Sequence, residues 1–257
     1  MKTFNKHVKW RKDKNWIFIC DCKRLIDFKL PLIQEQFMKK LDGGVEEKTL
    51  TKEEKMVFDD FKKMKMLSNL KIARLTEKHF KEAIRILDNE LGIKRVRNAK
   101  FLHDKFKEFP QFFMGIFHDK ELVGLICGFP RDDYLLMSEI AIDSRFHGRG
   151  YGENLVREFE KKAYKYKKIH AGAEDNAIGF YKQVGYKPFL LIQVLKKDYK
   201  PSDYSNFNIK KVLEVNNQII IEAKAKEVNK NVLEKYRKTH PFAHFQFIFV
   251  KELNKKN

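Results

Sequence analysis

The sequence predicts an α/β (α+β) protein with a central mixed β-sheet flanked by helices. Strand-like runs alternate with amphipathic helical patterns between about residues 70 and 195, and a glycine cluster separates one of these strands from a long helix. The chain has 257 residues, enough for one large domain with appendages or for two domains. We expect three segments, which are 1–68, 69–196 and 197–257.

The first segment, 1–68, shows a strand pair followed by two amphipathic helices. Strand-like runs lie at Trp16–Cys20 and Leu25–Phe28, and a helical pattern then continues until Gly43-Gly44 stops it. Thr51 precedes the second helix and is followed three residues later by a glutamate, which is the pattern of a capping box. This order predicts a small winged-helix-like module.

The central segment gives the order strand, two helices, three strands, helix, strand, helix, strand. The spacing of apolar residues distinguishes strands from helices along the chain, and the resulting order of elements constrains the fold strongly. The expected elements are a strand near Ile72–Leu75, helices from Thr76 to about Leu91 and from about Ala99 to Phe109, strands Phe112–Phe117, Leu122–Phe129 and Tyr134–Ile142, a helix from about Gly150 to Tyr166, a strand Lys168–Ala171, a helix Ala177–Val184 and a strand Lys187–Leu195.

The last segment, 197–257, predicts a C-terminal α+β extension. It is linker-like as far as Asn206 and then regains strand and helix patterns. It forms either a third small unit or an extension of the central sheet. The expected elements are strands near Ile209–Leu213 and Gln218–Ala223, a helix near Asn231–Lys238 and a strand Phe245–Val250.

The composition bears on location, metals and partners. Apolar runs fall far short of the roughly 18 residues that a membrane span needs, so we expect no membrane association and a cytoplasmic protein. Cys20 and Cys22 share a strand face without a second cysteine pair, and Pro241 interrupts the helical spacing of His240 and His244, so we expect no metal. The net charge of +19 favours encounter with nucleic acid or other acidic ligands.

A glycine cluster between a predicted strand and a predicted helix is the strongest local signal. It reads His147-Gly148-Arg149-Gly150-Tyr151-Gly152. Glycines let backbone amides approach a ligand, and the N-terminus of the following helix adds partial positive charge. Such a loop suits a pyrophosphate. It is not a Walker loop, because no Gly-Lys-Ser/Thr follows.

Two stretches resemble the motifs of GNAT N-acetyltransferases. The strand end Ile140-Ala141-Ile142, the glycine loop and the helix start after it are similar to motif A, and 177–186, with Tyr181 before a Gly-aromatic pair, is similar to motif B. The resemblance covers about residues 70–195 and implies the GNAT fold, with a splayed sheet and acetyl-CoA as cosubstrate.

This chain departs from the family pattern at two positions. His147 stands where the family usually has Gln or Arg, although its backbone amide can still serve; a register starting at Arg145 is the alternative and fits the helix start less well. Glu174 stands where the family often has Asn, and Asn176 follows two residues later. We place Asn176 and Tyr181 among the CoA contacts, together with the glycine loop.

The resemblance also implies a part for each residue in the reaction. The pantetheine of acetyl-CoA is expected to pair with the backbone of Ile140, Ala141 and Ile142, and the amide of Ile142 to polarise the thioester. Glu139 is the candidate base; it is otherwise an exposed carboxylate or an ion-pair partner. Tyr181 is the candidate proton donor to the leaving thiolate, and is otherwise a packing residue.

The acceptor is the open question. The pattern of 1–68 faintly resembles RiPP recognition elements, which are winged-helix peptide-binding modules; a winged helix that contacts nucleic acid and a structural cap are the alternatives. We expect acetylation of a peptide or protein amine, with 1–68 affecting acceptor choice and not acetyl transfer itself. An RNA-linked amine, a small-molecule amine and a non-catalytic CoA-binding regulatory module are the alternatives. The sequence does not indicate the oligomeric state.

Overall fold

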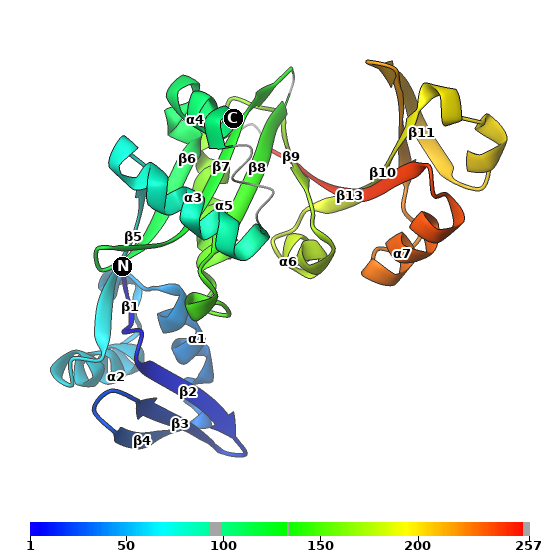
Figure 1. Cartoon of the computed structure of the whole chain (residues 1–257). Coiled ribbons are helices and arrows are strands. Elements are labelled where there is room, and N and C mark those ends of the chain that lie inside the picture. Colours follow the sequence, from blue (N-terminus) through cyan, green and yellow to red (C-terminus); the bar gives the residue numbers. More distant parts are fainter. Residues whose placement is uncertain (93–98, 133, 254–257) are drawn as a thin grey trace. The chain divides into compact units, whose positions relative to one another are not determined.

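The computed structural model describes residues 1–92, 99–132 and 134–253 (Figure 1). The chain packs as two compact units, one made of Met1–Cys127 with Glu139–Phe159 and the other of Gly128–Ser138 with Glu160–Asn257. Strands β7 (Glu121–Arg131) and β8 (Tyr134–Ile142) contribute to both units. The two units therefore do not coincide with the three predicted segments.

The first unit begins with a three-stranded antiparallel sheet and two helices. The pairing of β3 (Trp16–Asp21) with β4 (Ile26–Pro31) confirms the predicted strand pair, and β2 (Val8–Asp13) adds a third strand. The sequence analysis missed β2 because lysine and arginine occupy its outer face. Helices α1 (Glu35–Gly43) and α2 (Lys52–Lys63) follow.

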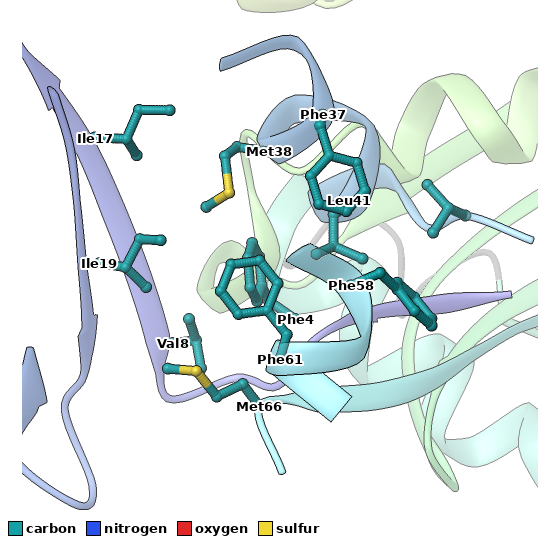
Figure 2. Close-up of a cluster of buried hydrophobic side chains, with 11 residues drawn as sticks. Phe4, Val8, Ile17, Ile19, Phe37, Met38, Leu41, Phe58, Phe61 and Met66 are labelled. Atoms are coloured by element: carbon teal, nitrogen blue, oxygen red, sulfur yellow. The ribbon is translucent and has the colours of Figure 1, made fainter. Parts of the chain in front are cut away.

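The core of this N-terminal part lies between the sheet and the two helices. Ile17 and Ile19 point from β3 toward Met38 of α1 and Phe61 of α2, as Figure 2 shows. Their neighbours in β3 point the other way because successive strand residues alternate between faces. The predicted capping box of α2 is confirmed, since the Thr51 side chain accepts from the Glu54 amide and the Glu54 carboxylate accepts from the Thr51 amide.

The same N-terminal chain also enters the sheet of the first unit. Strand β1 (Lys2–Phe4) pairs antiparallel with β5 (Leu67–Arg74), and the strand order is β1-β5-β6-β7-β8. Residues 1–68 are thus joined to this sheet by a strand pair as well as by the chain itself.

The predicted element order from β5 onward is confirmed. An apolar cluster that includes Leu87 of α3, Phe106 of α4 and Ala141 of β8 packs these helices against the sheet. The helix after the glycine loop ends at Lys162, earlier than the predicted Tyr166. The bounds are α3 (Glu77–Leu91), α4 (Ala99–Glu108), β6 (Phe113–His118), α5 (Tyr151–Lys162), β9 (Lys168–Gly172), α6 (Ile178–Gln183) and β10 (Lys187–Leu195).

The second unit resolves the place of the C-terminal tail, which extends the sheet. Its strand order is β8-β9-β13-β10-β12-β11, so β13 (Ala243–Glu252), near the end of the chain, lies between β9 and β10 (Figure 1). Phe245, Phe247 and Phe249 alternate along β13 and are fully buried, which fixes its register. The remaining elements are β11 (Asn208–Val215), β12 (Gln218–Lys224) and α7 (Lys230–Thr239).

Two further features of the described residues concern membranes and metals. None of the helices in the described ranges is both long and apolar enough to cross a membrane. The same ranges contain no cluster of three or more His, Cys, Asp or Glu residues arranged to hold a metal ion.

Candidate functional site

The glycine loop connects the end of β8 to the start of α5. Gly148 and Gly150 adopt φ angles of +75° and +74°, in the left-handed region that favours glycine, and α5 begins directly afterwards at Tyr151. Among the described residues, no atom lies within 4 Å of the position that a Cβ on Gly148 would occupy. The loop therefore offers backbone amides and a helix N-terminus to an anion without side-chain obstruction at this glycine.

The side chain of His147 is held against the strand end that precedes the loop. Its Nε2 lies 2.6 Å from the carbonyl oxygen of Ile142 and 3.6 Å from the carboxylate of Glu90 on α3. The other oxygen of Glu90 accepts from the Ser144 amide at 2.9 Å. These contacts fix the turn between strand and loop.

An ion-pair network secures the same turn. The guanidinium of Arg145 donates to both carboxylate oxygens of Asp143, at 2.9 and 2.7 Å, and to Glu121 at 2.7 Å. The hydrogen bonds from Arg145 lower the pKa of Asp143 although burial opposes the shift. The side chain of Arg145 is therefore committed to carboxylates of the protein.

Two side chains of the loop point away from the open space and into the N-terminal segment. Arg149 is only 6% exposed and donates to the carbonyls of Phe4 and Val8, while the hydroxyl of Tyr151 donates to Thr3 Oγ1 at 3.5 Å. Sequence reasoning placed both residues in the loop but missed these contacts. Their partners lie more than 140 residues away in the chain, and no local pattern signals them.

Strand β8 presents the predicted pantetheine and base positions on opposite faces. Glu139 is 8% exposed and shares a face with Ala141, whereas Ile140 and Ile142 are half-buried on the other face. Glu139 is therefore not the exposed carboxylate that was one alternative to a catalytic base. The register of β8 with β9 covers Leu135–Met137 among the described residues, and β8 continues beyond it to Ile142.

The predicted motif-B residues belong to the second unit. Tyr181 on α6 is 4% exposed and stacks on Phe249 with a centroid distance of 5.2 Å, and its ring meets Tyr186 edge to face. Asn176 is exposed in the short turn before α6. The structure thus groups residues 139–152 in one unit and Asn176 with Tyr181 in the other.

Comparison with known families assigns the part of the chain that contains these motifs. Residues 76–186 match the model of the acetyltransferase (GNAT) family. These residues form a GNAT acetyltransferase domain. The enzyme class is therefore that of a GNAT-type acyltransferase.

The comparison with curated proteins gives no match. Several solved structures have a similar chain path. Ard1 from Thermoplasma volcanium has 19% sequence identity and a TM-score of 0.43, with 61% of this chain and 99% of that chain covered. YhbS from Escherichia coli in complex with CoA has 18% identity and a TM-score of 0.39, over 47% and 69%. Arabidopsis thaliana Naa50 with a bisubstrate analogue has 15% identity and a TM-score of 0.39, over 61% and 98%.

The sheets that carry the GNAT motifs extend beyond the family match. In the first unit β1 and β5 precede residue 76, and in the second unit β10, β11, β12 and β13 all follow residue 186. Within the second unit, Nζ of Lys251 on β13 donates to the Glu160 carboxylate at 2.8 Å and to the Val184 carbonyl at 3.1 Å. The flanks therefore take part in building the elements on which the GNAT motifs lie.

Proposed function

We propose that this protein transfers the acetyl group of acetyl-CoA to an amine of a peptide or protein. The observation that carries the proposal is the glycine loop at the start of α5, with Gly148 and Gly150 in left-handed conformations, inside the segment that matches the GNAT family. The amides of residues 148–152 would hold the CoA pyrophosphate, because they combine unhindered donors with a helix N-terminus. Acetyl-CoA supplies the thioester.

The residues around the loop then have defined parts. The backbone of Ile140–Ile142 would pair with the pantetheine as an added strand, and the Ile142 amide would stabilise the negative charge that develops on the thioester oxygen. Glu139 would accept the proton that the amine loses as its nitrogen bonds to the carbonyl carbon. Tyr181 would donate a proton to the thiolate released when the C–S bond breaks; ordinary values of pKa, about 10 for tyrosine and about 8.5 for a thiol, suit this transfer.

A hollow on the outer face of the β2–β3–β4 sheet supports a polypeptide acceptor. It has a volume of about 540 Å³, and its lining includes Phe18 of β3, the three cations Lys9, Arg11 and Lys29, and one carboxylate, Asp27. The side chains on this face alternate with the buried ones of the module core, so they are free of any structural role in that core. A peptide that carries carboxylates and apolar side chains matches this surface.

The aromatic rings on this face favour a peptide over a nucleic acid. Lys29 Nζ lies 4.3 Å from the ring centroid of Trp16, and the Arg11 guanidinium lies 5.8 Å from that of Phe18. Bases that stack on aromatic rings need the ring faces to be open. The carboxylates of a peptide can instead pair with Lys29 and Arg11 while these cations remain over the rings.

The test is acetyl-CoA turnover with panels of acidic and basic peptides, polyamines and tRNA. We expect acetylated peptide, confirmed by mass spectrometry, with acidic peptides preferred over basic ones and the preference reduced by Lys29→Met. Turnover only with polyamines or with tRNA would contradict the peptide acceptor, and a steep salt dependence would accompany tRNA. CoA binding without turnover on any amine would indicate a regulatory module.

A further inference from the structure

The side chain of Arg149 occupies an unusual place for a residue in the middle of a ligand-binding loop. It lies between Gly148 and Gly150, yet its guanidinium is buried and donates to the Phe4 carbonyl at 3.2 Å and to the Val8 carbonyl at 3.5 Å. Both acceptors are backbone groups of the N-terminal segment, at the end of β1 and the start of β2. The loop is thus attached to the segment by its central side chain.

We propose that Arg149 is a positioning residue that holds the glycine loop in its ligand-binding conformation by anchoring it to residues 1–68. The proposal rests on the function proposed above, since it concerns the same loop. It makes acetyl-CoA binding and the packing of the N-terminal segment two coupled properties. It replaces the expectation that residues 1–68 act on acceptor choice alone.

The need for an anchor follows from the glycines on either side. Glycine has more conformational freedom than any other residue, so a loop with Gly148 and Gly150 pays a large entropic cost when a ligand orders it. A side chain fixed between the two glycines restricts the backbone on both sides before the ligand arrives. Such preorganisation raises affinity without adding a contact to the ligand.

Contacts around Arg149 reinforce the same attachment. The Asn154 side chain on α5 donates to the Gly43 carbonyl at 2.5 Å. A Cβ placed on Gly43 would lie 3.4 Å from the Arg149 carbonyl oxygen, so the end of α1 packs closely on the loop backbone. His118 Nε2, at the end of β6, lies 3.0 Å from the same Phe4 carbonyl that Arg149 binds.

The half-buried carboxylate of Asp42 interacts electrostatically with Arg149. Asp42 accepts a hydrogen bond from the indole of Trp10 at 2.5 Å, and its backbone carbonyl accepts from Thr3 Oγ1 at 2.8 Å. Burial raises the pKa of Asp42, while the Trp10 hydrogen bond and the charges of Arg149 and Lys9 lower it. Removing the N-terminal segment would therefore take away the carbonyl partners of Arg149 and its interaction with Asp42.

The coupling is reciprocal. If the attachment makes CoA bind more tightly, then bound CoA must stabilise the attachment by the same free energy. Hydrogen exchange can detect this second effect far from the ligand, at the amides of β1 and β2. An arginine that only stabilised the fold would not make the protection of these amides depend on bound CoA.

The experiment compares Arg149→Met with Arg157→Met in the full-length protein. Arg157 is an exposed arginine on α5 that pairs with Glu153. Its replacement removes the same charged side chain but none of the contacts to residues 1–68. We expect Arg149→Met to weaken CoA binding at least about tenfold in calorimetry, and Arg157→Met to stay within about twofold. In the wild type, CoA should slow exchange at the β1 and β2 amides, and in Arg149→Met this protection should be lost.

The outcomes separate the two proposals. Unchanged CoA affinity in Arg149→Met, with the same protection of β1 and β2 as in the wild type, would overturn the anchor while leaving CoA binding intact. Failure of the wild type to bind CoA would overturn the proposed function and the anchor with it. If Arg149→Met does not fold, Arg149→Lys decides, because lysine keeps the charge but loses the planar fork; wild-type affinity and protection in that variant would contradict the proposal.

Discussion

The guanidinium of Arg237 on α7 donates hydrogen bonds to both carboxylate oxygens of Asp175, at 2.7 and 3.2 Å, and to the Phe245 carbonyl at 2.9 Å. Asp175 lies in the turn that leads into α6, the helix of the Tyr181 motif. The hydrogen bonds from Arg237 therefore connect the C-terminal extension to the start of that helix. A bidentate arginine fixes geometry as well as charge, so the extension acts as a support for α6.

Replacing Arg237 should test this support. We expect Arg237→Met to lower the free energy of unfolding by roughly 1 kcal/mol, since the pair is partly exposed and its charge term is screened. Hydrogen exchange at the amides of 175–178 should become faster. Lys238→Met, one residue further on the same helix and exposed, is the control and should change neither quantity.

Glycine at position 150 should be required for CoA binding. The φ angle of +74° strains any other residue, so a substitution should shift the backbone amides that we propose to hold the pyrophosphate. The added Cβ itself would make only an ordinary contact, 3.7 Å from the Cα of Gly43. We expect Gly150→Ala to weaken CoA binding at least about tenfold in calorimetry.

A matched control for Gly150→Ala lies at the end of α3. Gly92 has a φ angle of +87° and open space around it among the described residues, so Gly92→Ala carries similar backbone strain away from the loop. Both variants should lose about 1 kcal/mol of stability, and only Gly150→Ala should lose affinity. Equal CoA affinities for the two would remove the loop from the binding site.

The hydroxyl of Tyr181 should matter for turnover more than for binding. Phenylalanine keeps the stacking on Phe249, so Tyr181→Phe removes the hydroxyl and little else. A proton donor to the leaving thiolate acts in the transition state, and we expect kcat to fall about 100-fold with little change in KM for acetyl-CoA. Tyr186→Phe is the control: this neighbour is also buried, burial raises its pKa, and its kcat should stay within about twofold. Similar constants for the two variants would make Tyr181 a packing residue.

The local signals in the sequence predicted the element order and the loop. The spacing of hydrophobic residues located α3, α5 and β8. The glycine cluster located the loop in which Gly148 and Gly150 adopt left-handed conformations. The capping box at Thr51 was equally local. Such features rest on a few consecutive residues, which a single sequence displays directly.

Long-range features could not be predicted in the same way. The strand β2 carries Lys9 and Arg11 on its outer face, and these charges hide the alternation that would predict a strand. The insertion of β13 between β9 and β10 and the attachment of Arg149 to Phe4 depend on tertiary packing of distant segments. Glu139 is the converse case, since its place on the buried face of β8 follows from its spacing to Ala141, which the sequence displays directly.

The pairing of Asp143 with Arg145 predicts a specific dependence of stability on pH. Hydrogen bonds from Arg145 hold the pKa of Asp143 below its ordinary value in the folded state, which is about 3.9 in unfolded chains. The ionised carboxylate therefore stabilises the fold at pH values above about 4, and this contribution is lost as the pH falls through the folded pKa.

Asp143→Asn removes that contribution and with it part of the pH dependence. At pH 7 we expect the variant to be less stable than the wild type by roughly 1 kcal/mol, because Arg145 keeps only its pairing with Glu121. As the pH falls from about 5 to about 3, the wild type should lose this advantage and the difference between the two unfolding free energies should shrink. Urea unfolding monitored by circular dichroism at several pH values measures it, with Arg157→Met as an exposed-charge control. A difference that stays constant over this range would mean that the Asp143 carboxylate is not stabilised by Arg145 in the folded protein.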